Sequence, residues 1–241
     1  MTRTGAGRSG ATVMSLQGRV QKYLHDWRTF PADASMAYRR DGVRGLWETV
    51  APRSVYRIVR SGRMIVFSQS LDELPVVPLP AGVTIAPLGV NDWPALESLV
   101  PQRELDRFQL LVSGGRTCLV AWRGARPIGY AWVARSIGTD VTLCQFPLPP
   151  HAAYLWDLYV EPAERCNGIG SALASARLRT AREQGFREGW RMIAPSNRAS
   201  LRTLEKSGRG TRVVGELRFL KILARMHIRL VGWNPLPEGT V

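Results

Sequence analysis

Residues 155–173 read LWDLYVEPAERCNGIGSAL. The first six, Leu155–Val160, are mostly apolar residues that favour β-structure and predict a buried strand, which Glu161 and Pro162 end. A turn with two glycines follows, and a helical pattern begins after it. We expect the apolar face of this helix to carry Ile169, Ala172, Leu173, Ala176 and Thr180, and Gly185 to stop it.

A strand, a glycine turn and a helix in succession suit the binding of phosphate by backbone. The N–H groups at a helix start point outward, and the helix dipole there favours an anion. Gly168 and Gly170 let the main chain approach a diphosphate without a Cβ clash, and Arg165 adds a positive charge. Two glycines alone also fit a tight strand-to-helix connection that binds nothing.

The longer pattern favours binding. Arg-x-x-Gly-x-Gly, directly after an apolar strand that ends in Val-Glu-Pro, resembles the acyl-CoA-binding motif of the GNAT N-acyltransferases. A second block, NRASLRTLEKSG, resembles the next helix of that family, with Asn197, Ser200 and Gly208 at matching places. The two blocks cover residues 155–208, and the order of elements extends the resemblance to about residues 82–233. It implies an α/β fold with a mixed central β-sheet flanked by helices.

Composition and cysteine usage indicate in which cellular compartment the protein works. No apolar run approaches the roughly 18 residues that a membrane helix needs, and the start, MTRTGAGRSGAT, lacks the apolar segment of a secretory signal. The cysteines, Cys118, Cys144 and Cys166, have no metal-ligand spacing. We therefore expect a reduced, cytoplasmic protein without disulfides or metal.

The formal net charge is +14, and thirty of the 33 basic residues are arginine. The charge is concentrated in residues 39–63 and 165–229. Such fields attract anions, such as CoA phosphates, an acidic acceptor, an acidic carrier protein, a membrane surface or nucleic acid. Nucleic acid is the least favoured, because no recognition motif accompanies the charge.

The chain divides into three predicted parts. Residues 1–80 form a basic, helical N-terminal extension with a proline-rich linker, residues 81–233 the acyltransferase domain, and residues 234–241 a tail. In the extension we expect helices over 13–30 and around Val43–Val50, and a strand over 64–69. Its arginines fit a solvated rim on a packed helical layer better than a surface for a membrane or partner.

The acyltransferase domain shows regular patterns outside the opening stretch. Three prolines rule out a central strand in the loop 136–153, which could shape the acceptor pocket. The predicted elements are a strand at Val83–Ile85, helices over 91–112 capped by Asn91 or Asp92, a hairpin of Thr117–Trp122 and Ile128–Ala134, a strand at Trp190–Ile193, a helix capped by Ser196 or Asn197 with Leu201 and Leu204 inward, and last strands at Val213–Val214, Leu217–Lys221 and Met226–Leu230.

The resemblance also implies a donor site for acetyl-CoA or another acyl-CoA. The backbone of Leu158, Tyr159 and Val160 would bond the pantetheine arm like an added strand, and an N–H near Tyr159 or Val160 would face the thioester oxygen. Asn197 and Ser200 match positions near the pantetheine. The pyrophosphate would be gripped by backbone N–H groups of Cys166, Asn167, Gly168, Ile169, Gly170 and Ser171.

Amine acylation also needs a group that takes the proton of the amine. Asp157 lies where relatives often carry an acidic base, and a lone carboxylate in an apolar strand is unusual. Its side chain should point opposite to those of Trp156 and Leu158. A structural strut, paired with an arginine, is an equal alternative.

The departing thiolate has no evident proton donor. Many relatives carry a tyrosine seven residues after the helix-opening asparagine, where this chain has Leu204. Tyr154 or Tyr159 could take that role, or the thiol, with a pKa of about 8.5, could leave unassisted. His25, His151 and His227 are poor substitutes by position.

The sequence thus predicts an N-acetyltransferase of GNAT type, with Asp157 and Tyr159 as catalytic candidates and a small-molecule or peptide amine as acceptor. One alternative is a donor carried by an acyl carrier protein. Another is a nonenzymatic acyl-CoA sensor, which the residue at position 204 keeps open. A monomer or a homodimer is compatible with this pattern.

Overall fold

The structure, a computed structural model, describes residues 59–74, 76–139, 141–142, 144–207, 210–222 and 225–235, and the helical positions 35, 38, 39, 42 and 43. The chain forms two compact units, residues 1–50 and 51–241. Apart from those five positions, the helices expected over 13–30 and around Val43–Val50 lie outside the described residues.

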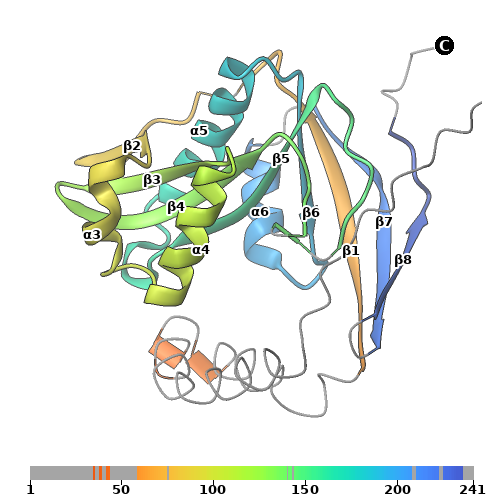
Figure 1. The fold of residues 1–241 in the computed structure, drawn as a ribbon. Helices are drawn as coiled ribbons and strands as arrows, with labels where there is room; N and C mark the ends of the chain where they lie inside the picture. The colour runs from red at the N-terminus through yellow and green to blue at the C-terminus, as the bar shows by residue number, and fades with distance from the viewer. Residues whose placement is uncertain are drawn as a thin grey trace, which may run out of the picture. The chain divides into compact units, whose positions relative to one another are not determined.

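The larger unit is built on one mixed sheet (Figure 1). Eight strands of the described part follow the order β2-β3-β4-β5-β6-β1-β7-β8, and only β5 and β6 run parallel. The strands are β1 (Val59–Ser70), β2 (Val83–Pro87), β3 (Thr117–Arg123), β4 (Arg126–Ala134), β5 (Ala152–Val160), β6 (Glu188–Ile193), β7 (Thr211–Ile222) and β8 (Arg225–Val231).

Helices cover both faces of this sheet, which confirms the expected α/β fold. One face carries α3 (Trp93–Leu96) and α4 (Gln102–Ser113). The 3-10 turn η3 (Val90–Asp92) leads directly into α3, and η4 (Pro162–Glu164) lies between β5 and α5. The other face carries α5 (Ile169–Glu183) and α6 (Arg198–Ser207). No helix among the described residues is long and apolar enough to cross a membrane.

The first strand lies inside the sheet. β1 pairs with β6 on one edge and with β7 on the other, and its Val66 is fully buried. The strand predicted over 64–69 is therefore longer than expected, and the sheet includes residues that the sequence placed in the N-terminal extension. Periodicity identifies a strand but not its partners, which explains the difference.

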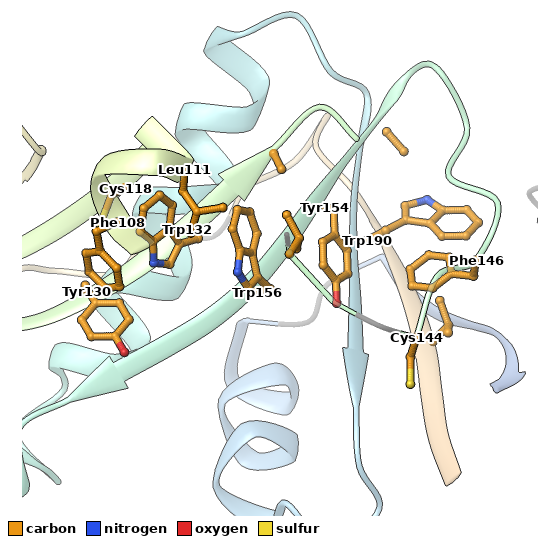
Figure 2. Close-up of a cluster of buried hydrophobic side chains, with 14 of the residues drawn as sticks. Phe108, Leu111, Cys118, Tyr130, Trp132, Cys144, Phe146, Tyr154, Trp156 and Trp190 are labelled. Carbon is orange, nitrogen blue, oxygen red and sulfur yellow. The ribbon is translucent and has the colours of Figure 1, made fainter. Parts of the chain in front are cut away.

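A row of aromatic side chains forms the core between α4 and the sheet (Figure 2). Trp132 stacks on Trp156 with ring centroids 5.5 Å apart, and Trp156 stacks on Tyr154 at 5.8 Å. Phe108 of α4 meets Trp132 edge-on at 4.8 Å. Such pairs add to the free energy of burial, so they fix α4 against the middle of β4 and β5.

Three predicted regions take a slightly different form. The helices expected over 91–112 are interrupted before Pro101, which caps α4. Asp92 is the N-cap residue of α3, as expected, but its carboxylate accepts a hydrogen bond from Gly89 N–H at 2.7 Å, at the start of η3, and makes no side-chain cap to α3. The first two of the three expected C-terminal strands are one strand, β7. The hairpin is as expected, whereas β5 begins at Ala152, inside the loop expected over 136–153.

Candidate functional site

The strands β5 and β6 separate in the middle of the sheet. Their parallel pairing joins only Ala152–Tyr154 to Glu188–Trp190. Beyond that point β5 continues to Val160, while β6 stays paired with β1 on its other edge. Within the described residues, the edge of β5 after Tyr154 that faces β6 has no strand partner. Its backbone groups can therefore bond an extended molecule as an added strand would.

A β-bulge lies on the same strand. On β4, Tyr130 pairs with Tyr159 and Trp132 pairs with Trp156. Two residues of β5, Asp157 and Leu158, therefore lie opposite one residue of β4, Ala131. Asp157 has a positive φ of 45°. β4 approaches closely here because it has Gly129, where a Cβ would lie 2.6 Å from the carbonyl oxygen of Tyr159. An isolated glycine within a strand pattern is a sequence signal for such a bulge, and our sequence analysis missed it.

The bulge decides where Asp157 points. Its Oδ2 lies 3.7 Å from Nη1 of Arg107 on α4, and its side chain is 34% exposed. Trp156 also faces α4, whereas Leu158 packs toward α5. The expectation that Asp157 points opposite to both neighbours is therefore wrong for Trp156, because a bulge places two successive residues on one face. The contact with Arg107, which sequence reasoning did not anticipate, fits a strut, and the exposure leaves the carboxylate accessible.

The predicted glycine turn opens α5. Gly168 is the N-cap with φ of 81°, and Cys166 also has a positive φ, 65°. The first hydrogen bond of the helix runs from Ala172 N–H to the Gly168 carbonyl at 3.0 Å. The N–H groups of the three residues before Ala172 therefore have no partner inside the helix. Residues 165–168 are exposed, so this helix end is open to an anion.

Gly170 distinguishes a ligand site from a simple connection. A Cβ at this position would lie 3.8 Å from the side chain of Val160 and 4.0 Å from that of Leu158, which is ordinary contact. The fold does not require glycine here, unlike at Gly168, where the positive φ does. An open helix end beside a position that the fold could fill with a side chain fits the diphosphate of an acyl-CoA.

The turn is fastened to the end of β5. Arg165 donates from Nε to the carbonyl of Val160 at 3.0 Å, and its guanidinium lies 5.9 Å from the ring centre of Tyr159. That ring packs on Tyr130 with centroids 5.4 Å apart. Arg165 thus supplies its positive charge to the turn and also orders the backbone.

Two further ion pairs hold the connection between β5 and α5. Arg126 binds Glu161, and Arg123 forms two hydrogen bonds with Glu164, the shorter at 2.9 Å. The hydrogen bonds and charge of Arg123 hold the pKa of the Glu164 carboxyl below its usual range. Both arginines come from the β3–β4 hairpin, which therefore positions the segment before the turn.

The second predicted block forms α6. Asn197 caps it, because its Oδ1 accepts the backbone N–H of Ser200 at 3.1 Å. Leu204 is buried with Phe67 and Ile193 in an apolar cluster, so position 204 supplies no hydroxyl group. Gly208, the expected end of the helix, lies outside the described residues.

The other candidate proton donors differ in surroundings. Tyr154 is 3% exposed, and burial raises the pKa of its phenol, which weakens it as an acid. Tyr159 is half-buried. His151 is exposed just before β5, and His227 is exposed on the edge strand β8. His25 lies outside the described residues. Of the two tyrosines considered as proton donors, only Tyr159 has a ring that is not fully buried, and it lies next to the bulge.

The family follows from comparison with known proteins. The model of the acetyltransferase (GNAT) family matches residues 86–208, just over half of the chain. The chain belongs to the GNAT acetyltransferase family. Among the described residues, no cluster of three or more potential metal ligands occurs. A comparison with curated proteins gives no match.

Solved structures share the fold at low sequence identity. A Drosophila protein is 18% identical over 76% of this chain and 67% of its own, with a TM-score of 0.51. The GCN5-related glucosamine N-acetyltransferase region of a fungal multi-domain GH3 beta-N-acetylglucosaminidase is 13% identical, with a TM-score of 0.51. That match covers 71% of this chain but only 22% of the fungal one.

Proposed function

We propose that the chain is an acyl-CoA-dependent N-acyltransferase that transfers an acetyl or other acyl group to the amine of a small molecule or peptide. The observation that carries the proposal is the edge of β5 after Tyr154, which has no strand partner among the described residues, beside the open N-terminus of α5. A diphosphate and an extended amide-containing arm need these two features side by side. Membership of the family supports the same assignment.

The donor would bind along two backbone segments. The N–H groups from Cys166 to Ser171 receive the pyrophosphate, and the edge of Leu158–Val160 bonds the pantetheine arm. The acyl-CoA supplies an activated thioester for the amine to attack. A backbone N–H at Tyr159 or Val160 faces the thioester oxygen and stabilises negative charge there. Asn197 and Ser200 at the start of α6 complete the donor side.

The acceptor would approach from the α4 side of the sheet. Asp157 lies on that side at the bulge and accepts the proton of the amine, while Arg107 holds its carboxylate in place. Tyr159 returns a proton to the departing thiolate. Leu204 cannot donate a proton, which is the observation that favours the second candidate, a nonenzymatic acyl-CoA sensor.

Calorimetric titration with CoA and acetyl-CoA tests the donor site, with Gly170→Ala as the informative variant. The added methyl group meets only ordinary contacts in the protein and favours the helix, so the melting temperature should stay equal or rise. The methyl group would also lie at the helix start, where the diphosphate of CoA must approach the main chain. We expect CoA affinity to fall about tenfold, the effect of a modest steric conflict of about 1.4 kcal/mol.

Glu183→Ala, at the exposed far end of the same helix, is the matched control and should leave affinity unchanged. Equal CoA binding by Gly170→Ala and wild type would remove the turn from the donor site. No binding of any acyl-CoA to wild type would instead favour a donor on an acidic acyl carrier protein. Tight binding without transfer to any of a panel of amines would support the sensor.

A further inference from the structure

Two arginines are buried inside the larger unit and form no ion pair with any described carboxylate. Arg177 of α5 is 6% exposed and Arg191 of β6 is 3% exposed. Among the described residues, the Nε atom of neither has a hydrogen-bond partner. Arg191 donates one hydrogen bond from Nη2 to Oε1 of the buried Gln69. Buried charges in folded proteins are normally paired, so this pair requires an explanation.

The two arginines lie on elements that pack together, because a Cβ at Gly189 of β6 would lie 3.1 Å from the side chain of Leu178, the residue after Arg177 on α5. Burial lowers the pKa of Arg177 to about 10 and that of Arg191 to about 9, and the charge of Arg177 contributes to the second shift. Both values are well above 7, so both side chains stay positive at neutral pH. Two neighbouring cations in a region of low dielectric constant repel each other unless an anion joins them.

The two arginines lie near the point in the sheet where β5 and β6 begin to separate. Arg191 is the first residue of β6 after its last pairing with β5, at Trp190. A Cβ at Gly189 would contact Leu178 of α5, so Arg191, two residues further along β6, also faces the helices. Arg177 comes seven residues after Gly170 and lies on the same face of α5. The arginines and the glycine turn therefore mark the two ends of one path.

An acyl-CoA arm would follow that path. Its diphosphate is at the start of α5, beside Val160, and its arm runs back toward Tyr154 along the edge of β5 that has no strand partner in the described part of the chain. The acyl end of the donor is then the part that reaches the arginines. Guanidinium groups bind carboxylates through paired hydrogen bonds, which a terminal methyl group cannot accept.

We propose that Arg177 and Arg191 bind a carboxylate at the far end of the acyl group, so that the preferred donor is the CoA thioester of a dicarboxylic acid such as succinic acid. This inference rests on the proposed acyl-CoA site and specifies its substrate. The carboxylate bonds to the guanidinium groups without any covalent change, and only the acyl transfer at the thioester follows.

The test compares succinyl-CoA with butyryl-CoA, which has the same number of acyl carbons and no charge, in calorimetric titrations without acceptor. Hydrogen bonds to charged groups contribute enough for a preference of about tenfold or more for succinyl-CoA in wild type. Arg177→Met should abolish the preference and change butyryl-CoA affinity less than twofold. The control Arg179→Met, an exposed arginine on the same helix, should keep the preference.

A melting curve separates recognition from a structural role. Arg177→Met removes an unpaired buried charge, so its melting temperature should equal or exceed that of wild type. If Arg177→Met does not fold, Arg177→Lys keeps the charge without the paired donors and should reduce the preference severalfold. A lowered melting temperature with the succinyl preference intact would overturn the proposal and leave Arg177 as a structural residue.

Three further outcomes are distinct. If wild type binds CoA and both thioesters equally, this inference fails while the proposed function stands. If it binds no CoA compound, the proposed function fails first. If acyl preference is absent but Arg177→Met raises KM for an amine acceptor that bears a carboxylate, the arginines serve the acceptor, and the assignment to the donor is overturned.

Discussion

Asp157 shows how one residue depends on its local backbone. A positive φ is costly for most side chains, but aspartate and asparagine adopt it more readily than others. The residue at the bulge therefore has a backbone reason to be Asp as well as a chemical one. Its contact with Arg107 fixes the carboxylate on the α4 side, where an amine acceptor could reach it.

Asp157→Asn separates these two roles, because asparagine keeps the backbone conformation and loses the basic oxygen. We expect kcat to fall by about a hundredfold or more, since a general base typically contributes at least that much. CoA affinity and melting temperature should change little. Steady-state kinetics and calorimetry check this, with the exposed Asp106→Asn as control. An unchanged kcat would leave Asp157 as a strut.

At the scale of elements, the proposed donor site depends on the connection between β5 and α5. The strand ends at Val160, the helix begins at Ile169, and Arg123 and Arg126 of the hairpin hold the residues between them. In the proposed site, the N-terminus of α5 binds a diphosphate beside the edge of β5 only if this connection keeps its path. We therefore expect these exposed ion pairs to affect CoA affinity.

Glu164→Gln tests that dependence. The partner Arg123 is exposed, so the expected effect is small, a rise of about twofold in the Kd for CoA at pH 7 that salt reduces. Because the folded-state pKa of Glu164 is lowered, its contribution to stability is present above the unfolded pKa and disappears as pH falls through the folded value. The difference in melting temperature between wild type and variant should therefore shrink in acid.

Glu97→Gln, an exposed carboxylate on a different helical segment, is the control for a general charge effect. If it weakens CoA binding as much as Glu164→Gln does, the ion pair has no special part in holding the turn. A stability difference that grows as pH falls would contradict the sign of the pKa shift.

At the scale of the whole molecule, β1 joins two parts of the sheet. It lies between β6, which borders the proposed donor site, and β7, which leads to β8. Residues 234 and 235 are also tied to β7, because Arg212 donates to the carbonyls of Asn234 and Pro235. The first two residues of the expected tail are thus hydrogen-bonded to the sheet.

Truncation tests which domain boundary is correct: the one between the two compact units, at residue 50, or the one predicted from the sequence, at residue 80. A chain of residues 51–241 should keep the far-UV circular dichroism of a mixed sheet and the CoA affinity of the full chain. A chain of residues 81–241 should lose both, since removing β1 leaves β6 and β7 without their shared partner. Full CoA affinity in the shorter chain would show that the sheet closes without β1.

The sequence by itself determined the features that depend on neighbours along the chain. The strand Leu155–Val160, the glycine turn, the cap at Asn197 and the hairpin around residues 117–134 are local, since propensity, capping and glycine conformation act within a few residues. The tertiary structure decided the rest. The insertion of β1 and the packing of Arg177 on α5 against the strand that carries Arg191 depend on contacts between distant segments, which no local pattern specifies. Gly129 signals a bulge, but its position at Asp157 depends on the register between β4 and β5.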